Sequence, residues 1–171
     1  MTRHIIINLF RFIILVLLQI FVFNHFQLMG FINPYVYILF ILLLPLETPK
    51  WLLLVLGFII GYVIDYFSHS IGINIFSTVL VAYLRPVFIK YVIPKLEPGP
   101  DVRISIKQIG FSSFLTYTGL LVFIHHITLF YLEIFRLSYF FITLKHAILS
   151  SIVTIILILI SQYLFYSRKK L

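Results

Sequence analysis

The chain lacks cysteine altogether and has few charged residues. Its 171 residues include no cysteine, and only 11% are charged. The absence of cysteine excludes a disulfide framework and thiolate metal sites. Soluble domains carry about 25% charged residues, so this chain has too little polar surface to cover a globule in water. Because 62% of its residues are hydrophobic, we expect its natural solvent to be lipid.

Residue groups typical of membrane enzymes are also missing from the sequence. Only one aspartate, Asp65, falls inside an apolar stretch, whereas an intramembrane aspartyl protease needs two. Carboxylates are too scattered to hold a divalent metal for phosphatidyl transfer. The sequence has neither a Gly-x-Ser-x-Gly-like nucleophile site nor a phosphate-binding glycine loop. We therefore expect no enzymatic activity and no cofactor.

The histidines do not have the spacing of a metal site. No HExxH or His-x3-His pair occurs, although several histidines fall near one side of the predicted membrane. We interpret them as solvated side chains at the membrane interface. They are His25, His69, His125, His126 and His146.

Long apolar stretches fill most of the chain. A helix needs about 20 apolar residues to cross a bilayer, and six stretches qualify or nearly do. They are residues 5–26, 31–46, 51–68, 74–93, 109–131 and 143–166. The pattern predicts an all-α integral membrane protein, with residues 1–171 forming a single polytopic transmembrane domain of about six helices.

The second stretch is the shortest of the six. Its roughly 16 residues reach only about 24 Å as a helix. Pro34 lies near its start and Pro45 near its end. This segment could therefore be a short span or a re-entrant loop. Charge favours a span, because a re-entrant loop would invert the later helices and place most basic residues outside.

Basic residues predict the orientation of the six spans. With six spans and both termini in the cytoplasm, ten of the 13 basic residues fall on the cytoplasmic side, as the positive-inside rule requires. Two fall outside, and Arg85 lies within a span. The ten are Arg3, Arg11, Lys50, Lys90, Lys95, Arg103, Lys107, Arg168, Lys169 and Lys170.

Three polar positions inside the spans call for an explanation, because intramembrane ionisable groups are costly. Gly57, Gly61 and Asp65 share one helix face, where two glycines allow a close helix approach. Asp65 either caps the next loop or anchors a partner or ligand. Gln19 is expected to hydrogen-bond another helix, and Arg85 to extend toward the cytoplasmic headgroups.

Several short pieces of the sequence resemble one known family in their order and spacing. The pattern Gly57-Phe58-x-x-Gly61-x-x-x-Asp65-x-x-Ser68 is followed by Gly72. It resembles the third-helix signature of the rod shape-determining protein MreD family. Further similar pieces are Leu17-Leu18-Gln19, Asn33-Pro34 and Ala82-Tyr83-Leu84. Residues 94–108 have no clear counterpart.

The resemblance implies an inner-membrane protein that works with the bitopic protein MreC. It implies a complex with the actin-like MreB, a RodA-type glycosyltransferase and a class B penicillin-binding transpeptidase. The expected function is a non-enzymatic scaffold for lateral peptidoglycan synthesis and cell shape, with membrane lipid but no nucleic acid as a further partner. Candidate partner-contact or helix-packing residues are Gln19, Gly57, Gly61, Asp65, Gly72 and Arg85.

A second function fits the same size and number of spans. The family is similar in fold to the substrate-binding subunits of energy-coupling-factor vitamin transporters. A transporter subunit would have a ligand pocket near the outer face, lined by Asp65, His69 and aromatic side chains. It would also dock an ATPase through helix faces rich in alanine and glycine. Only two alanines, Ala82 and Ala147, are present, which favours the scaffold.

Overall fold

The protein is a bundle of long helices joined by short helical turns. The computed structural model describes residues 2–25, 30, 32–94, 102, 104–135 and 137–167. The long helices are α1 (Thr2–Phe21), α3 (Lys50–Ser68), α4 (Ile73–Val92), α6 (Phe111–Ile134) and α7 (Phe140–Ser167). The short elements are η1 (Phe23–His25), η2 (Val36–Ile38), α2 (Leu39–Leu42), α5 (Ile106–Ile109) and η3 (Leu137–Tyr139).

Five helices in the described part of the chain are long and apolar enough to cross a membrane. They cover five of the six predicted spans, with ends within a few residues of those expected. Exposed side chains on them are mostly large and apolar, such as Phe10, Phe58 and Ile160. The chain is therefore an all-α membrane protein.

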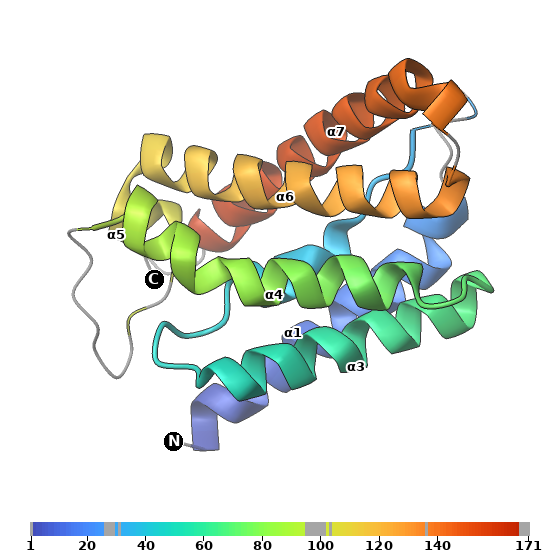
Figure 1. The fold of residues 1–171 in the computed structure, drawn as a ribbon. Helices are drawn as coiled ribbons and strands as arrows, with labels where there is room; N and C mark the ends of the chain where they lie inside the picture. Colours follow the sequence, from blue (N-terminus) through green and yellow to red (C-terminus); the bar gives the residue numbers. More distant parts are fainter. Residues whose placement is uncertain are drawn as a thin grey trace.

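Neighbouring helices in the sequence are also neighbours in the bundle. α3 packs along α4, α4 along α6 and α6 along α7, while α1 lies against α3 (Figure 1). We call the end where α1 begins and α7 finishes the terminal end. The opposite end, where the α3–α4 and α6–α7 connections lie, is the hairpin end (Figure 1).

The stretch 31–46 does not form a helix of spanning length. Its helical part is limited to η2 and α2, which together run only from Val36 to Leu42. The described residues contain five helices of spanning length, so the expected count of about six is not confirmed. The side chains from Val36 to Leu44 are at most 7% exposed, so this segment is surrounded by protein.

This buried segment connects the two ends of the bundle. It starts beside the last turns of α1 at the hairpin end and leads to Lys50 at the terminal end, where α3 begins (Figure 1). We call residues 32–46 the crossing segment. Irregular backbone is tolerated at membrane depth only where protein or water covers it, and here the long helices provide that cover.

Candidate functional site

Two glycines of α3 allow its backbone to pack tightly against α4. A Cβ built on Gly61 would lie 2.6 Å from Ile75 Cα, and one on Gly57 would lie 3.1 Å from Ala82 Cβ. Glycine is required at Gly61 because the facing atoms belong to backbone and cannot turn aside. The predicted glycine face is thus covered by α4 of the same chain.

Asp65 caps the start of α4 from the neighbouring helix. Its Oδ2 accepts a hydrogen bond from Ile75 N at 2.9 Å, and its Oδ1 accepts one from Asn74 N at 3.1 Å. The N-cap position itself is Gly72, which offers no side chain. A carboxylate at a helix N-terminus satisfies free backbone N–H groups and complements the helix dipole. Asp65 therefore ties the hairpin together.

The loop between α3 and α4 depends on left-handed backbone at two positions. His69 has φ 53° and Gly72 has φ 77°. Glycine adopts this region without steric cost, which explains its use at Gly72. The side chain of Ser70 then donates to Asp65 Oδ1 at 2.6 Å, so the loop is closed on the same carboxylate.

A chain of hydrogen bonds leads from Asp65 into the centre of the bundle. Asn74 Nδ2 donates to Asp65 Oδ1 at 3.0 Å, which fixes the orientation of the amide, because an ionised carboxylate only accepts. Asn74 Oδ1 must then accept the proton of Tyr37 at 2.9 Å. It follows that His125 Nε2, at 2.9 Å, donates to the Tyr37 oxygen.

This assignment leaves one acceptor of His125 open. With the proton on Nε2, the Nδ1 atom of the neutral ring is a bare acceptor, and it is buried with no hydrogen-bond partner. His126 takes the opposite tautomer, since its Nδ1 lies 2.8 Å from the carbonyl of Val122 and must donate to it. The two adjacent rings thus differ in which nitrogen carries the proton.

Both rings are fully buried, at 0% exposure. The prediction that His125 and His126 are solvated at the interface was therefore wrong. The reason is that α6 packs between α4 and α7, so this face of α6 has no contact with water. Within the described residues, no group of three possible metal ligands comes together.

Gln19 holds the first part of the crossing segment. Its Nε2 donates to the carbonyl of Pro34 at 3.1 Å, and its Oε1 accepts from Val36 N at 2.9 Å. The same oxygen lies 3.4 Å from Tyr37 N. One amide side chain therefore replaces the hydrogen bonds that a regular helix would have supplied to this backbone.

Side chains of α7 complete the support at this end of the crossing segment. Asn33 N donates to Ser150 Oγ at 3.2 Å, and Tyr35 N donates to Thr154 Oγ1 at 3.1 Å. His126 Nε2 also lies 3.0 Å from Thr154 Oγ1. Small hydroxyl residues on α7 thus have a definite role, which is to satisfy backbone donors of a distant segment.

The other half of the crossing segment is held at the terminal end. Tyr117 donates to the carbonyl of Leu42 at 3.2 Å, and Arg11 donates to that of Leu43 at 3.3 Å. Arg85 donates to the carbonyl of Leu44 and is only 1% exposed. The prediction that Arg85 extends toward the headgroups was therefore wrong, because its side chain bonds instead to a buried carbonyl of the crossing segment.

The predicted site residues fall into two separate groups. Gly57, Gly61, Asp65 and Gly72 all belong to the α3–α4 hairpin. Gln19 and Arg85 hold opposite ends of the crossing segment. Sequence reasoning missed further buried polar residues that belong to the same contacts. They are Tyr37, Asn74, Thr78, Tyr117, His125, His126, Ser150 and Thr154.

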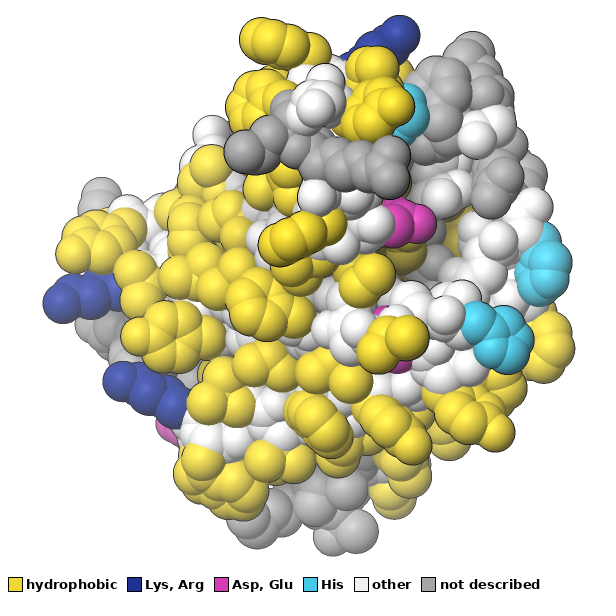
Figure 2. All heavy atoms as spheres, turned by 45° about the vertical axis from the view of Figure 1, so that its right-hand side comes forward, with side chains coloured by type: hydrophobic (Ala, Val, Ile, Leu, Met, Phe, Trp, Pro, Cys, Tyr) yellow, Lys and Arg dark blue, Asp and Glu magenta, His cyan; other side chains and the backbone are white. Residues whose placement is uncertain are grey.

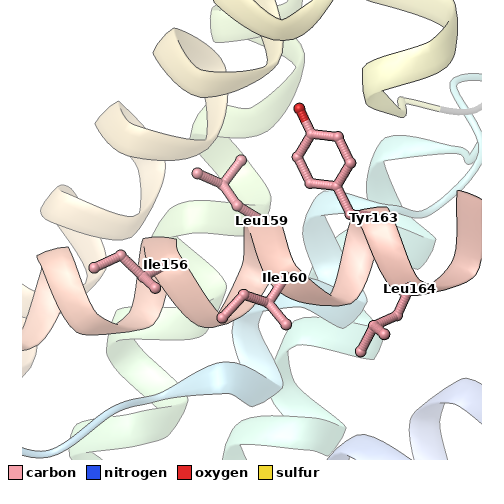
Figure 3. Close-up of a pocket in the computed structure, with 5 residues that line it drawn as sticks. All are labelled: Ile156, Leu159, Ile160, Tyr163 and Leu164. Atoms are coloured by element: carbon pink, nitrogen blue, oxygen red, sulfur yellow. The ribbon is translucent and has the colours of Figure 1, made fainter.

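Two of the hollows in the surface of the described residues differ in polarity. At the hairpin end, a cavity of about 330 Å³ lies among the end of α1, the start of the crossing segment, the α3–α4 loop and the end of α6. On the C-terminal half of α7, an open apolar depression of about 500 Å³ is lined by side chains of that helix alone, as Figure 3 shows. The first hollow is the polar one.

These features define an all-α membrane protein whose interior is organised around a buried, largely non-regular segment. Many of its buried polar side chains hydrogen-bond to backbone groups or to one another. Comparison of the chain with family models, curated proteins and solved structures gives no match.

Proposed function

We propose that the chain is a non-enzymatic scaffold of the bacterial cell-elongation complex. It would bind an MreC-type bitopic protein and act with MreB, a RodA-type glycosyltransferase and a class B penicillin-binding transpeptidase in lateral wall synthesis. The observation that carries the proposal is the α3–α4 hairpin. The residues of the family-like motif, Gly57, Gly61, Asp65 and Gly72, all contribute to its geometry.

The partner helix would bind on the outside of the bundle. The Gly57 and Gly61 face contacts α4, and Gln19 is 1% exposed, so neither is open to a partner. On α7, Ile156, Ile160 and Leu164 are spaced four residues apart and are 49–65% exposed beside the apolar depression (Figure 3). Such a ridge can pack into the groove of another helix. We place the MreC-type transmembrane helix there.

The distribution of charge supports the proposed orientation in the inner membrane. Lys50 begins α3, Lys90 lies in the last turn of α4 and Lys107 lies in α5, all at the terminal end. Figure 2 shows basic side chains at the left and another at the top beside a histidine, further histidines at the right, and apolar side chains between. The positive-inside rule then puts both termini in the cytoplasm. There these lysines would also attract anionic lipid, by about 1 kcal/mol each.

Affinity purification tests the scaffold function directly. The tagged chain would be purified in mild detergent from its native cells, and the co-purifying proteins identified by mass spectrometry. We expect MreC together with the glycosyltransferase and the transpeptidase. Recovery of a transporter ATPase pair without any of these proteins would contradict the proposal.

Site-specific photocrosslinking tests the placement of the partner helix. A photoreactive residue at Ile160 of α7 is expected to crosslink to MreC, whereas one at Phe58 of α3 is not. Both positions are exposed, at 49% and 51%, so they form a matched pair. Crosslinking at Phe58 alone would indicate that the partner helix binds on the α3 side of the bundle.

A substrate-binding subunit of a small-molecule transporter is the second candidate. The polar cavity at the hairpin end favours it, although the lining includes Tyr35, Ser70 and Glu133 rather than the expected Asp65 and His69. The two alanines, which would be needed for docking of an ATPase, are at most 1% exposed. We therefore keep the scaffold as the proposed function.

A further inference from the structure

The cavity at the hairpin end has an unused buried hydrogen-bond acceptor. Asn33 Oδ1 is buried and has no hydrogen-bond partner. Glu133 lines the same cavity and is exposed to solvent. A buried acceptor without a partner costs free energy, so a bound group that donates hydrogen bonds would be stabilised here.

Several other polar groups of the lining are hydrogen-bonded to one another. Gln19 Nε2 donates to Asn24 Oδ1 at 3.0 Å, and Asn24 Nδ2 donates to Ser68 Oγ at 2.9 Å. Asn74 Nδ2 is shared between Ser70 and Asp65. The buried acceptor left open in the lining is Asn33 Oδ1, so a ligand that satisfies it must supply a hydrogen-bond donor.

The surroundings of the cavity favour a positive charge. Glu133 is its one acidic lining residue, and the Asp65 carboxylate lies directly behind Ser70 and Asn74. Figure 2 shows acidic side chains in the surface around this end of the molecule. Phe23 and Tyr35 also line the cavity, and aromatic rings attract ammonium groups.

The position of the cavity relative to the membrane suggests where such a group comes from. α1, α3 and α6 all end around it, and the ends of spanning helices lie at the level of the lipid headgroups. We propose that the cavity binds a primary ammonium group of the ethanolamine type, carried either by a small amine or by a phospholipid headgroup. This site is separate from the proposed partner surface on α7.

Two measurements on the full-length chain in detergent test the site. Equilibrium dialysis with radiolabelled ethanolamine measures binding of the free amine. Native mass spectrometry after exposure to mixed phosphatidylethanolamine and phosphatidylglycerol vesicles measures which lipid the protein retains. Binding of free ethanolamine would identify a small amine as the source, and selective retention of phosphatidylethanolamine alone would identify the headgroup. A chain that shows neither would overturn the proposal.

Three substitutions connect the binding to these residues. Glu133→Gln is expected to weaken the affinity for the ammonium group by up to about fivefold, the limit for a solvent-accessible ion pair. Asn33→Asp places a second carboxylate in the cavity and is expected to strengthen it, a gain that misfolding could not produce. Glu47→Gln is the matched control, because Glu47 is exposed and lies just before α3 at the terminal end. Equal binding by the Glu133→Gln and Glu47→Gln variants would contradict the proposal.

The scaffold function and the ammonium site can fail independently. Glu133 lies outside the α7 ridge, so Glu133→Gln is expected to leave the recovery of MreC unchanged. If the wild-type chain binds ethanolamine but does not recover MreC, the scaffold function fails and the ammonium site stands.

Discussion

The α3–α4 hairpin and the crossing segment solve the same problem in different ways. Both place polar groups inside the membrane and both satisfy them within the protein. In the hairpin, Asp65 bonds to residues 70, 74 and 75, five to ten positions away. In the crossing segment, the partners of the backbone lie up to 119 positions away. The hairpin is a local structure, whereas the crossing segment depends on the completed bundle.

This difference predicts that the crossing segment is the more vulnerable region. Gln19→Leu should have the largest effect, about 3 kcal/mol, because it leaves Pro34 O and Val36 N buried without partners. Thermal unfolding in detergent would measure it. Gln162→Leu in α7 is the control for loss of an amide. Equal stability of the two variants would show that the crossing segment does not need Gln19.

The hairpin should be most sensitive to added volume at its glycine contact. Gly61→Ala is expected to destabilise the protein by about 2 kcal/mol, since the new Cβ meets the backbone of Ile75. Gly119→Ala is the matched control, because its Cβ would meet only Ile155 Cδ1 at 3.9 Å. That change should be neutral or stabilising, given the helix propensity of alanine. The same unfolding assay distinguishes them.

The cap provided by Asp65 should contribute less than the glycine contact. Asp65→Asn keeps one acceptor oxygen but loses the charge, and we expect a loss of about 1.5 kcal/mol. Hydrogen exchange of the amides at 74 and 75 would report it, with faster exchange expected at the start of α4. Unchanged exchange there would mean that the carboxylate is not the cap.

The smallest expected effect comes from a single hydrogen bond at the terminal end. Tyr117→Phe removes the donor to Leu42 O and should cost about 0.6 kcal/mol, the mean for such bonds in membranes. If Tyr117→Phe loses more stability than Gln19→Leu in the unfolding assay, Tyr117 would be more important than Gln19 in holding the crossing segment, which contradicts this ranking.

The sequence was informative wherever structure is local. Apolar stretches of spanning length predicted the five long helices, and the spacing of Gly57, Gly61 and Asp65 predicted their shared face. One of the two interpretations of Asp65, the cap of the following loop, is what the structure has.

The sequence was misleading wherever a partner comes from a distant part of the chain. Residues 31–46 look like a short helix because their side chains are apolar, and no local signal says that Gln19 and Thr154 will hold their backbone. The burial of Arg85 and His125 has the same cause, since both bond to the crossing segment. Their polarity was visible in the sequence, but their contacts required the bundle.

The central claim is that residues 32–46 carry the chain from one membrane face to the other without a spanning helix. Single-cysteine labelling tests it most directly, because the chain contains no cysteine of its own. His25→Cys and Glu47→Cys, both at exposed positions, would be treated in intact cells or spheroplasts with a membrane-impermeant maleimide. We predict labelling at residue 25 and protection at residue 47 until the membrane is permeabilised. Labelling of both residues from the same side would show that the segment does not cross.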